Sequence, residues 1–158
     1  MLLGGCARTV DCKKFARNYW PLVVLALPDV EQAYIVANMP ADRRHTVLIL
    51  ARSQATADDV GTLVRSTGCI ALFPKPDQGA LAALFHLRPD VVMLERGREE
   101  EASERFHAIT GTIGAGVVLF GEESPELRET AKVHGYRSVA ISAPARAFGF
   151  AIEEAAGA

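Results

Sequence analysis

From residue 46 to the end of the chain, short apolar runs alternate with stretches of helical periodicity, and this alternation constrains the fold more than any other feature. The apolar runs are rich in β-branched residues and lack polar alternation, as expected of strands that are buried on both faces. Five runs are predicted to be strands: 46–50, 69–73, 90–94, 116–120 and 137–141. Each is followed by one predicted helix: 53–66, 77–87, 99–110, 125–135 and 145–156.

Such an alternation requires right-handed crossovers, which produce a parallel sheet covered by helices on both faces. Five strand-helix units are too few to close an eight-stranded barrel. We therefore expect an α/β fold, a doubly wound five-stranded parallel sheet with strand order 2-1-3-4-5. In a sheet of this order, reactive groups and ligands lie at the carboxyl ends of strands one and three.

Residues 1–44 differ in character from the remainder, and we interpret them as an irregular N-terminal extension preceding a domain at 45–158. This segment contains Gly4-Gly5 and the prolines Pro21, Pro28 and Pro40, and its one candidate helix is 29–38. Met39 precedes an ordinary polar lead-in to the first strand, so we expect it to be the natural start. The intact mass of the native protein tests whether residues 1–38 belong to it.

Composition excludes several classes of protein. The formal net charge of -2 provides no electrostatic footprint for nucleic acid. No apolar stretch reaches the ~18 residues that a membrane span needs. The three cysteines, Cys6, Cys12 and Cys69, show no CxxC spacing, and we interpret Cys69 as a buried core thiol. These features favour a cytoplasmic protein in a reducing compartment.

The histidines also argue against a metal site built from Cys and His. His45, His86, His107 and His134 lie far apart in the sequence and form no ligand pair at helical spacing. His134 and Ser142 have no acidic partner nearby in the sequence, and we assign them no catalytic role. The sequence therefore predicts no metal ion, no cofactor and no catalytic residue.

The segment 88–95 (RPDVVMLE) resembles the stretch that leads into the phosphoacceptor of response-regulator receiver domains. The segment 126–135, followed by strand five and Ala143-Pro144, resembles the fourth helix and the Lys-Pro junction of the same family. The resemblance extends over all five strand-helix units. It implies the flavodoxin-like (βα)5 fold of receivers and a function in two-component-type signal transduction.

The positions that carry receiver chemistry depart from the family pattern. The phosphoacceptor aspartate corresponds to Glu95, and the two acidic residues that help to hold Mg²⁺ correspond to Ala51 and Arg52. The hydroxyl after strand four and the lysine after strand five correspond to Gly121 and Ala143. Because all five positions differ, we expect phosphotransfer to be absent and the domain to be a degenerate receiver, or pseudo-receiver.

Two interpretations of Glu95 remain open. Its carboxylate extends about one methylene farther than that of aspartate, so Arg52 could pair with it and hold the domain in one signalling state. Alternatively, both are solvated charges of a site that has drifted, and we favour this second interpretation. The nearby Arg96 and Arg98 could bind an anion before a helix N-terminus, but we interpret them as ordinary soluble surface. Glu122 and Glu123 are interpreted in the same way.

The function predicted from these residues is a stand-alone pseudo-receiver, a phosphorylation-independent protein-interaction module and not an enzyme. Its partners would be proteins, including a second copy that binds through the face formed by 126–134, strand five and 145–154. The family often has an aromatic switch residue in strand five, and this position corresponds to Ala140. Phe148 and Phe150 point apart on the last helix, so one of them is expected to be exposed.

Two other functions compete with this one. A flavodoxin-like small-ligand-binding protein or enzyme would use the crevice at the strand ends, but the loop 51–56 (ARSQAT) has hydroxyls and no phosphate-cradling glycine. A conventional receiver, phosphorylated on Glu95 or another residue, is the least favoured because the metal ligands are missing.

Overall fold

The computed structural model describes residues 44–158, and the following account is limited to them. The expected helix at 29–38 and the expected start at Met39 lie outside the described residues.

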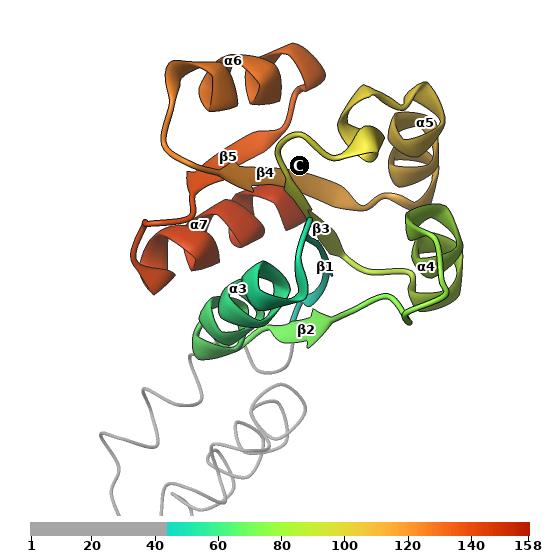
Figure 1. The fold of residues 1–158 in the computed structure, drawn as a ribbon, viewed down its shortest axis with the longest axis horizontal. Helices are drawn as coiled ribbons and strands as arrows, with labels where there is room; N and C mark the ends of the chain where they lie inside the picture. Colours follow the sequence, from blue (N-terminus) through green and yellow to red (C-terminus); the bar gives the residue numbers. More distant parts are fainter. Residues whose placement is uncertain (1–43) are drawn as a thin grey trace, which may run out of the picture. The chain divides into compact units, whose positions relative to one another are not determined.

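Five parallel strands form one sheet in the order β2-β1-β3-β4-β5, as predicted (Figure 1). The strands are β1 (Thr46–Leu50), β2 (Ile70–Leu72), β3 (Val91–Glu95), β4 (Gly116–Gly121) and β5 (Arg137–Ala140). The side chains of β1 from Val47 to Leu50 and those of β3 from Val91 to Leu94 are buried. Continuous burial explains why these strands are apolar runs rather than alternating ones.

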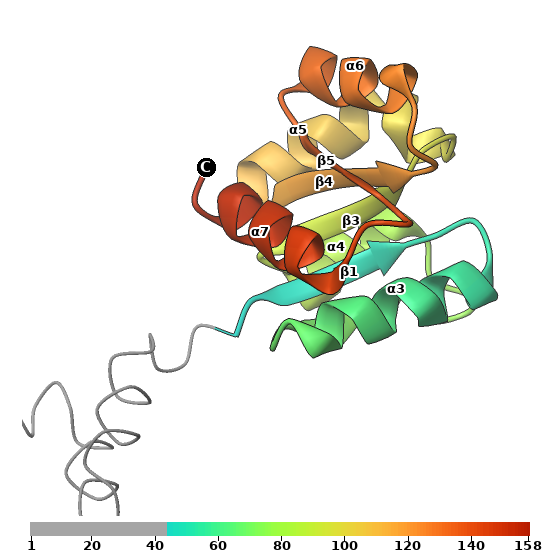
Figure 2. The same ribbon diagram turned by 90° about the vertical axis from the view of Figure 1, so that its left-hand side faces the viewer.

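Helices cover both faces of the sheet, so each face has its own apolar cluster (Figure 2). Helices α3 (Gln54–Ser66) and α7 (Ala145–Ala156) pack on one face, where Phe148 and Ile152 are fully buried. The opposite face is covered by α4 (Ala80–Leu87), α5 (Glu104–Ile113) and α6 (Pro125–His134). Phe150 is 68% exposed, which confirms that the two phenylalanines of α7 point apart.

Three helices begin at a serine whose side chain accepts a hydrogen bond from a backbone N–H of the first turn. These serines are Ser53 for α3, Ser103 for α5 and Ser124 for α6. Ser124 and Pro125 form the helix start that the sequence indicated, and Gly135 ends α6 in the left-handed conformation at φ +70°.

Apart from shifts of one to three residues at the ends of other elements, the structure differs from the sequence prediction in three places. The predicted helix 99–110 is divided into a short 3-10 helix, η1 (Glu99–Ala102), and α5, because Ser103 caps a new helix. Helix α4 begins at Ala80 rather than at residue 77, because a turn in which the Gln78 amide N–H donates to the Lys75 carbonyl precedes it. Strand β2 excludes Cys69, whose thiol is half-buried against the core rather than fully buried as expected.

Candidate functional site

The carboxyl ends of β1 and β3 lie side by side at the point where the strand order reverses. Leu50 at the end of β1 is in register with Leu94, so Ala51 and Arg52 follow β1 beside Glu95, the last residue of β3. The helices after these two strands cross to opposite faces of the sheet, so no helix covers this edge. The fold therefore brings together three of the five positions that the sequence singled out.

The carboxylate of Glu95 is held by the main chain of the β1 loop. Its Oε2 accepts a hydrogen bond from the backbone N–H of Arg52 at 2.5 Å. The side chains of Arg52 and Glu95 do not form an ion pair; in the described part of the chain the ion pairs are Arg98–Glu100, Arg128–Glu123 and Arg137–Glu154. Glu95 is therefore neither paired with the guanidinium of Arg52 nor simply solvated.

Arg98 lies at this edge and is held by several hydrogen bonds, together with Glu100, which the sequence analysis did not single out. Its Nη1 donates to the backbone carbonyl of Ala51 at 2.5 Å. Its Nε and Nη2 donate to the two carboxylate oxygens of Glu100 at 2.8 and 2.7 Å, a bidentate ion pair. The side chains of Arg98 and Glu100 are 24% and 7% exposed, so the interpretation of Arg98 as ordinary soluble surface is wrong.

The ion pair shifts the pKa of both partners. The hydrogen bond to Glu100 raises the pKa of Arg98, against the effect of burial, and the negative charges of Glu100, Glu99 and Glu95 raise it further. The same hydrogen bond holds the pKa of Glu100 below its usual range, although burial opposes this shift. Both groups are therefore kept charged at neutral pH.

The loop between β3 and η1 is fixed by further hydrogen bonds. Gly97 has φ +85°, a left-handed conformation that favours glycine, and its N–H donates to Oε2 of Glu101 at 2.6 Å. The backbone N–H of Arg96 donates to the Phe120 carbonyl at 2.8 Å. The side-chain Nη1 of Arg96 donates to Oγ of Ser124 at 3.1 Å. The loop is thus tied to β4 and to the start of α6.

The remaining two positions contribute no polar side chain to this edge. A Cβ atom built on Gly121 would lie 3.3 Å from Cβ of Arg96, so the side chain of Arg96 lies close to the position that a residue 121 side chain would occupy. Ala143 is half-buried and packs against the core on the α3 and α7 face. Neither a hydroxyl after β4 nor an amine after β5 is present at these positions.

No family model and no curated relative match the chain. Solved structures do match it, and those below are all receiver domains or CheY-like proteins. The Vibrio cholerae chemotaxis protein CheY4 is 16% identical, with a TM-score of 0.56 over 70% of this chain and 98% of that one. The signal receiver domain of a putative Luxo repressor protein from Vibrio parahaemolyticus is 14% identical, with a TM-score of 0.57 over 72% of this chain and 91% of that one. The signal receiver domain of a modulated diguanylate cyclase from Desulfovibrio desulfuricans is 19% identical, with a TM-score of 0.56 over 72% of this chain and 94% of that one.

The chain has the receiver fold.

The receiver fold implies Mg²⁺ beside the phosphoacceptor, and the residues present here do not fit that ion. Mg²⁺ requires an octahedral set of oxygen ligands, normally including carboxylates. Here Ala51 offers only a backbone carbonyl, which accepts from Arg98, and Oε2 of Glu95 accepts from the Arg52 N–H. Among residues 44–158 no group of three or more His, Cys, Asp or Glu side chains could hold a metal ion.

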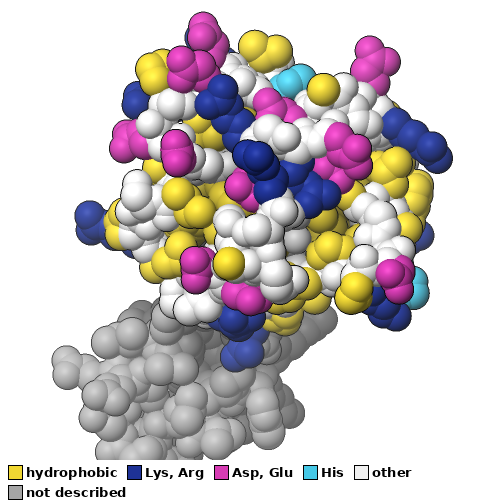
Figure 3. Space-filling model, viewed as in Figure 1, with side chains coloured by type: hydrophobic (Ala, Val, Ile, Leu, Met, Phe, Trp, Pro, Cys, Tyr) yellow, Lys and Arg dark blue, Asp and Glu magenta, His cyan; other side chains and the backbone are white. Residues whose placement is uncertain are grey.

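The crevice beside β1 in this receiver fold is small. It encloses about 150 Å³ and is lined by Arg52, Ser53, Phe73 and Arg98 among other residues. Sites for small organic ligands usually enclose roughly 300–1,000 Å³. The crevice volume therefore argues against the alternative of a flavodoxin-like ligand-binding protein. Figure 3 shows acidic and basic side chains interspersed over the surface that includes this edge, without one large field of either sign.

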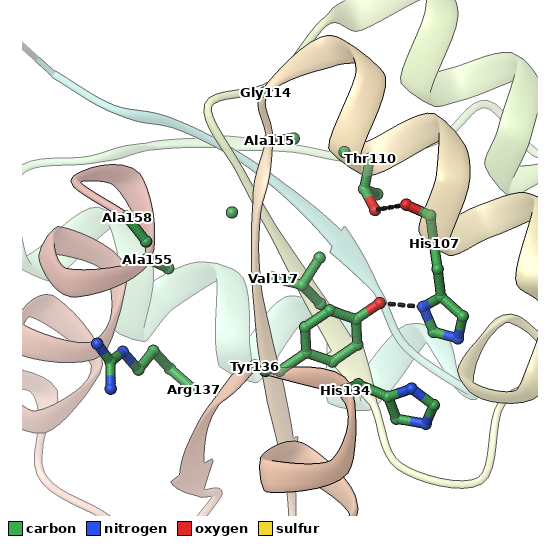
Figure 4. A pocket seen from close by; sticks show the side chains of 13 residues that line it. His107, Thr110, Gly114, Ala115, Val117, His134, Tyr136, Arg137, Ala155 and Ala158 are labelled. Carbon is green, nitrogen blue, oxygen red and sulfur yellow. Dashed lines mark hydrogen bonds between the residues drawn. The ribbon is translucent and has the colours of Figure 1, made fainter.

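A larger pocket, of about 390 Å³, lies at the amino ends of β4 and β5, on the opposite edge of the sheet (Figure 4). The Tyr136 hydroxyl is hydrogen-bonded to Nδ1 of His107, and Nε2 of His107 lies 2.9 Å from the carbonyl of Glu101. Because a carbonyl only accepts, Nε2 carries the proton in neutral His107 and the Tyr136 O–H donates to Nδ1. The His134 ring stacks on that of His107 with centroids 4.5 Å apart.

Two of the histidines that lie far apart in the sequence meet beside this pocket. His107 of α5 and His134 of α6 come together although they are distant in sequence, because both helices cover the same face of the sheet. Burial raises the pKa of Tyr136 to about 12, and a weaker opposing effect comes from Thr110. Both ring nitrogens of His107 are already bonded within the protein, so this cluster is a packing feature rather than a ligand set.

In the part of the chain that the structure describes, no helix is both long and apolar enough to cross a membrane.

Proposed function

We propose that this chain is a pseudo-receiver, a cytoplasmic signalling module that acts by binding proteins, is not phosphorylated and is not an enzyme. The observation that carries the proposal is the bond between Oε2 of Glu95 and the backbone N–H of Arg52. Glu95 corresponds to the phosphoacceptor in the resemblance to receivers. One oxygen of its carboxylate is hydrogen-bonded within the protein, and no acidic side chain directly follows β1 to hold a metal ion.

Phosphoryl transfer to a receiver depends almost entirely on positioning and on neutralising the charge of the phosphoryl oxygens. A phosphoryl group on Oε2 of Glu95 would have to displace the Arg52 N–H. The described residues place no lysine directly after β5, no hydroxyl directly after β4 and no pair of acidic residues after β1. Signalling through protein contacts alone is the function that this arrangement supports best.

A titration with Mg²⁺ and beryllofluoride, followed by amide NMR shifts, tests the proposal. We expect no saturable shift at Arg52, Glu95 or Gly121, whereas a phosphorylatable receiver examined in parallel should respond. Incubation with acetyl phosphate and Mg²⁺ should leave the intact mass unchanged. Saturable shifts at these three amides, or a gain of one phosphoryl mass, would return the chain to conventional receivers.

We further propose that the face formed by α6, β5 and α7 binds a second copy of the chain. Strand β5 is an edge of the sheet, so its outer main-chain groups have no neighbouring strand. A groove of about 510 Å³ runs along it, lined by Ser124, Arg128, Val139 and Ala147 among other residues. The face carries both the Arg128–Glu123 and the Arg137–Glu154 pairs, and surfaces with both signs of charge can complement themselves about a two-fold axis.

Sedimentation velocity over a range of concentrations tests this interface. The native chain should show a concentration-dependent shift towards a dimer. The variant Arg128→Glu should shift the equilibrium to monomers, while Arg105→Glu, an exposed substitution on α5, should not. A chain that remains monomeric at the highest concentration would exclude a self-interaction but not other protein partners.

A further inference from the structure

We propose that the outer side of α4, together with the groove between α4 and η1, binds a basic amphipathic helix of another protein. This inference rests on the proposed function, because it names the class of partner that a module acting through protein contacts would bind. The site uses different elements from the face of α6, β5 and α7 that we propose for a second copy.

Four large hydrophobic side chains are exposed among the described residues. Val133 of α6 and Phe150 of α7 belong to helices of the face already proposed for self-association. Phe85 of α4, 55% exposed, and Ile70 of β2, 43% exposed, do not. Ile70 points to the same side of the sheet as Leu72, which packs in the cluster that α4 covers. Two of the four are thus left on the α4 side of the sheet without an assigned role.

The composition of α4 is unusual for a helix at the surface. Its sequence, ALAALFHL, contains no Asp, Glu, Lys or Arg, whereas each of the other four described α-helices contains at least two such residues. A helix that is apolar on all sides is normally buried on all sides. Ala82, Phe85 and His86 are instead exposed, at the i, i+3 and i+4 spacing that places them on one side of the helix. In the described part of the chain nothing covers this mainly apolar side.

A groove of about 340 Å³ lies between the start of α4 and η1. Leu81 lines the groove and lies one turn before Phe85, so the groove adjoins the exposed side of α4. Helices α4 and α5 lie side by side, and Ser103, the cap of α5, forms another part of the wall (Figure 1). An apolar side chain of a partner can enter the groove while its helix lies along α4, as amphipathic helices do in hydrophobic grooves.

The charge of the groove indicates the sign of the partner. Among the described residues, its lining includes the carboxylates of Glu99 and Glu100 and no lysine or arginine. Glu100 is neutralised by its bidentate pair with Arg98, whereas Glu99 is exposed and forms no ion pair within residues 44–158. The groove thus keeps a negative charge, which favours a partner with a lysine or arginine beside its apolar anchor.

Peptide titrations of the full chain, followed by amide NMR shifts, test the inference. The probe is a helical peptide of leucine and lysine, about 14 residues long, with leucine at i, i+3, i+4 and i+7 spacing. A matched peptide has glutamate in place of lysine. We expect saturable shifts at Leu81, Phe85 and Ser103 with the lysine peptide, and binding about tenfold weaker or less with the glutamate peptide. Shifts confined to α6, β5 and α7, or equal binding of the two peptides, would overturn the inference.

Two exposed phenylalanines provide a matched pair of variants. Phe85→Ser should weaken binding of the lysine peptide about tenfold or more, because buried aromatic anchors dominate interface energies. Phe150→Ser, the same change at a side chain of α7 that is 68% exposed, should leave binding within about twofold of the native value. Serine and phenylalanine have similar helix propensities, so both helices should persist. An equal effect of the two substitutions would contradict binding at α4.

The variant Glu99→Gln tests the charge of the groove separately. It should weaken binding of the lysine peptide about two- to fivefold, the range that an exposed ion pair supplies. Glu129→Gln removes an exposed carboxylate from α6 and should leave binding unchanged. The same loss in both variants would show that only the net charge of the chain attracts the peptide, and the inference would fail.

Two other occupants of the α4 surface would give different results. If a second copy covers it, Phe85→Ser should reduce self-association in sedimentation velocity, which would overturn the inference. If another part of the chain covers it, a soluble gadolinium chelate should leave the ring signals of Phe85 in the free full chain as sharp as those of the buried Phe106. Selective broadening of the Phe85 signals supports an open surface that awaits a partner.

Failure of this inference and failure of the proposed function are distinguishable. Absence of peptide shifts at α4 overturns the inference and leaves the pseudo-receiver function standing, because that function is tested with Mg²⁺ and beryllofluoride at other residues. Beryllofluoride shifts at Arg52, Glu95 and Gly121 overturn the proposed function, whatever the peptide shows at α4.

Discussion

The two edges of the sheet each carry a hydrogen-bonded cluster, and the clusters are built from different chemistry. At the carboxyl edge, Arg98 and Glu100 are full charges in a bidentate pair that is largely removed from solvent. At the amino edge, His107 and Tyr136 form a single hydrogen bond without an acidic partner, and His134 stacks on the imidazole. The carboxyl cluster connects β1, β3 and η1, whereas the amino cluster connects α5 with the α6–β5 turn.

The difference matters because removing one partner costs a different amount of unfolding free energy in each cluster. Loss of one partner from a buried ion pair leaves an uncompensated charge, which is much more costly than a lost neutral hydrogen bond. The carboxyl edge is thus the more fragile of the two, although receivers use that edge for chemistry. A built-in ion pair at that position makes the integrity of the fold depend on the loop that a conventional receiver uses for regulation.

The largest effect is expected for Glu100→Gln. This change leaves the mostly buried guanidinium of Arg98 without a counter-ion, and we expect a loss of about 2 kcal/mol of unfolding free energy, below the full value for a buried pair because Arg98 is partly exposed. Urea denaturation measures it. The matched control is Glu123→Gln at the exposed Arg128–Glu123 pair, where the change should stay within about 0.5 kcal/mol. Equal effects at the two sites would contradict the contrast between the edges.

The same pair should give the carboxyl edge an acid-dependent stability. The pKa of Glu100 lies below its usual value of 4.5, so the unfolded chain takes up this proton first as the pH decreases. The contribution of Glu100 is therefore fully present above about pH 4.5 and is lost as the pH falls through the lowered pKa. The difference in unfolding free energy between the native chain and Glu100→Gln should shrink from pH 6 downwards to pH 3. A difference that grows on acidification would show that the sign is wrong.

The strands and most of the helices could be predicted because their signals are local, and their alternation along the chain then indicated the sheet order. Buried parallel strands must be apolar throughout, and the Ser124-Pro125 pair marks the start of α6 by itself. The break in the predicted helix 99–110 was missed because Ser103 lies within a stretch that otherwise fits one helix. A serine inside a charged helical pattern does not indicate whether it caps or continues a helix.

The sequence predicted where the site lies, but not the hydrogen bonds and ion pair that its residues form. Ala51, Arg52 and Glu95 lie at the switch point because the strand order places them there. The bond that holds Glu95 comes from a backbone N–H, and main-chain donors leave no mark on the sequence. Likewise, the Arg98–Glu100 pair depends on the path of the chain through Gly97 and the 3-10 turn, which spacing along the sequence does not show. The contact of His107 with His134 depends on how α5 and α6 are placed on the same face of the sheet.

The smallest effect is expected at the amino edge, for Tyr136→Phe. The change leaves Nδ1 of His107 without its hydrogen-bond partner, and we expect a loss of about 1 kcal/mol, roughly half that at Glu100. Burial raises the pKa of Tyr136 from 10.0 to about 12, so its contribution is fully present below pH 10 and is lost as the pH rises through about 12. The chain has three tyrosines, so the difference between the alkaline absorbance titrations of the native chain and Tyr136→Phe isolates this phenol. If the difference titration instead showed the Tyr136 phenol half-ionised near pH 10, this side chain would be open to solvent. The two clusters would then differ in their exposure to solvent rather than in their charge.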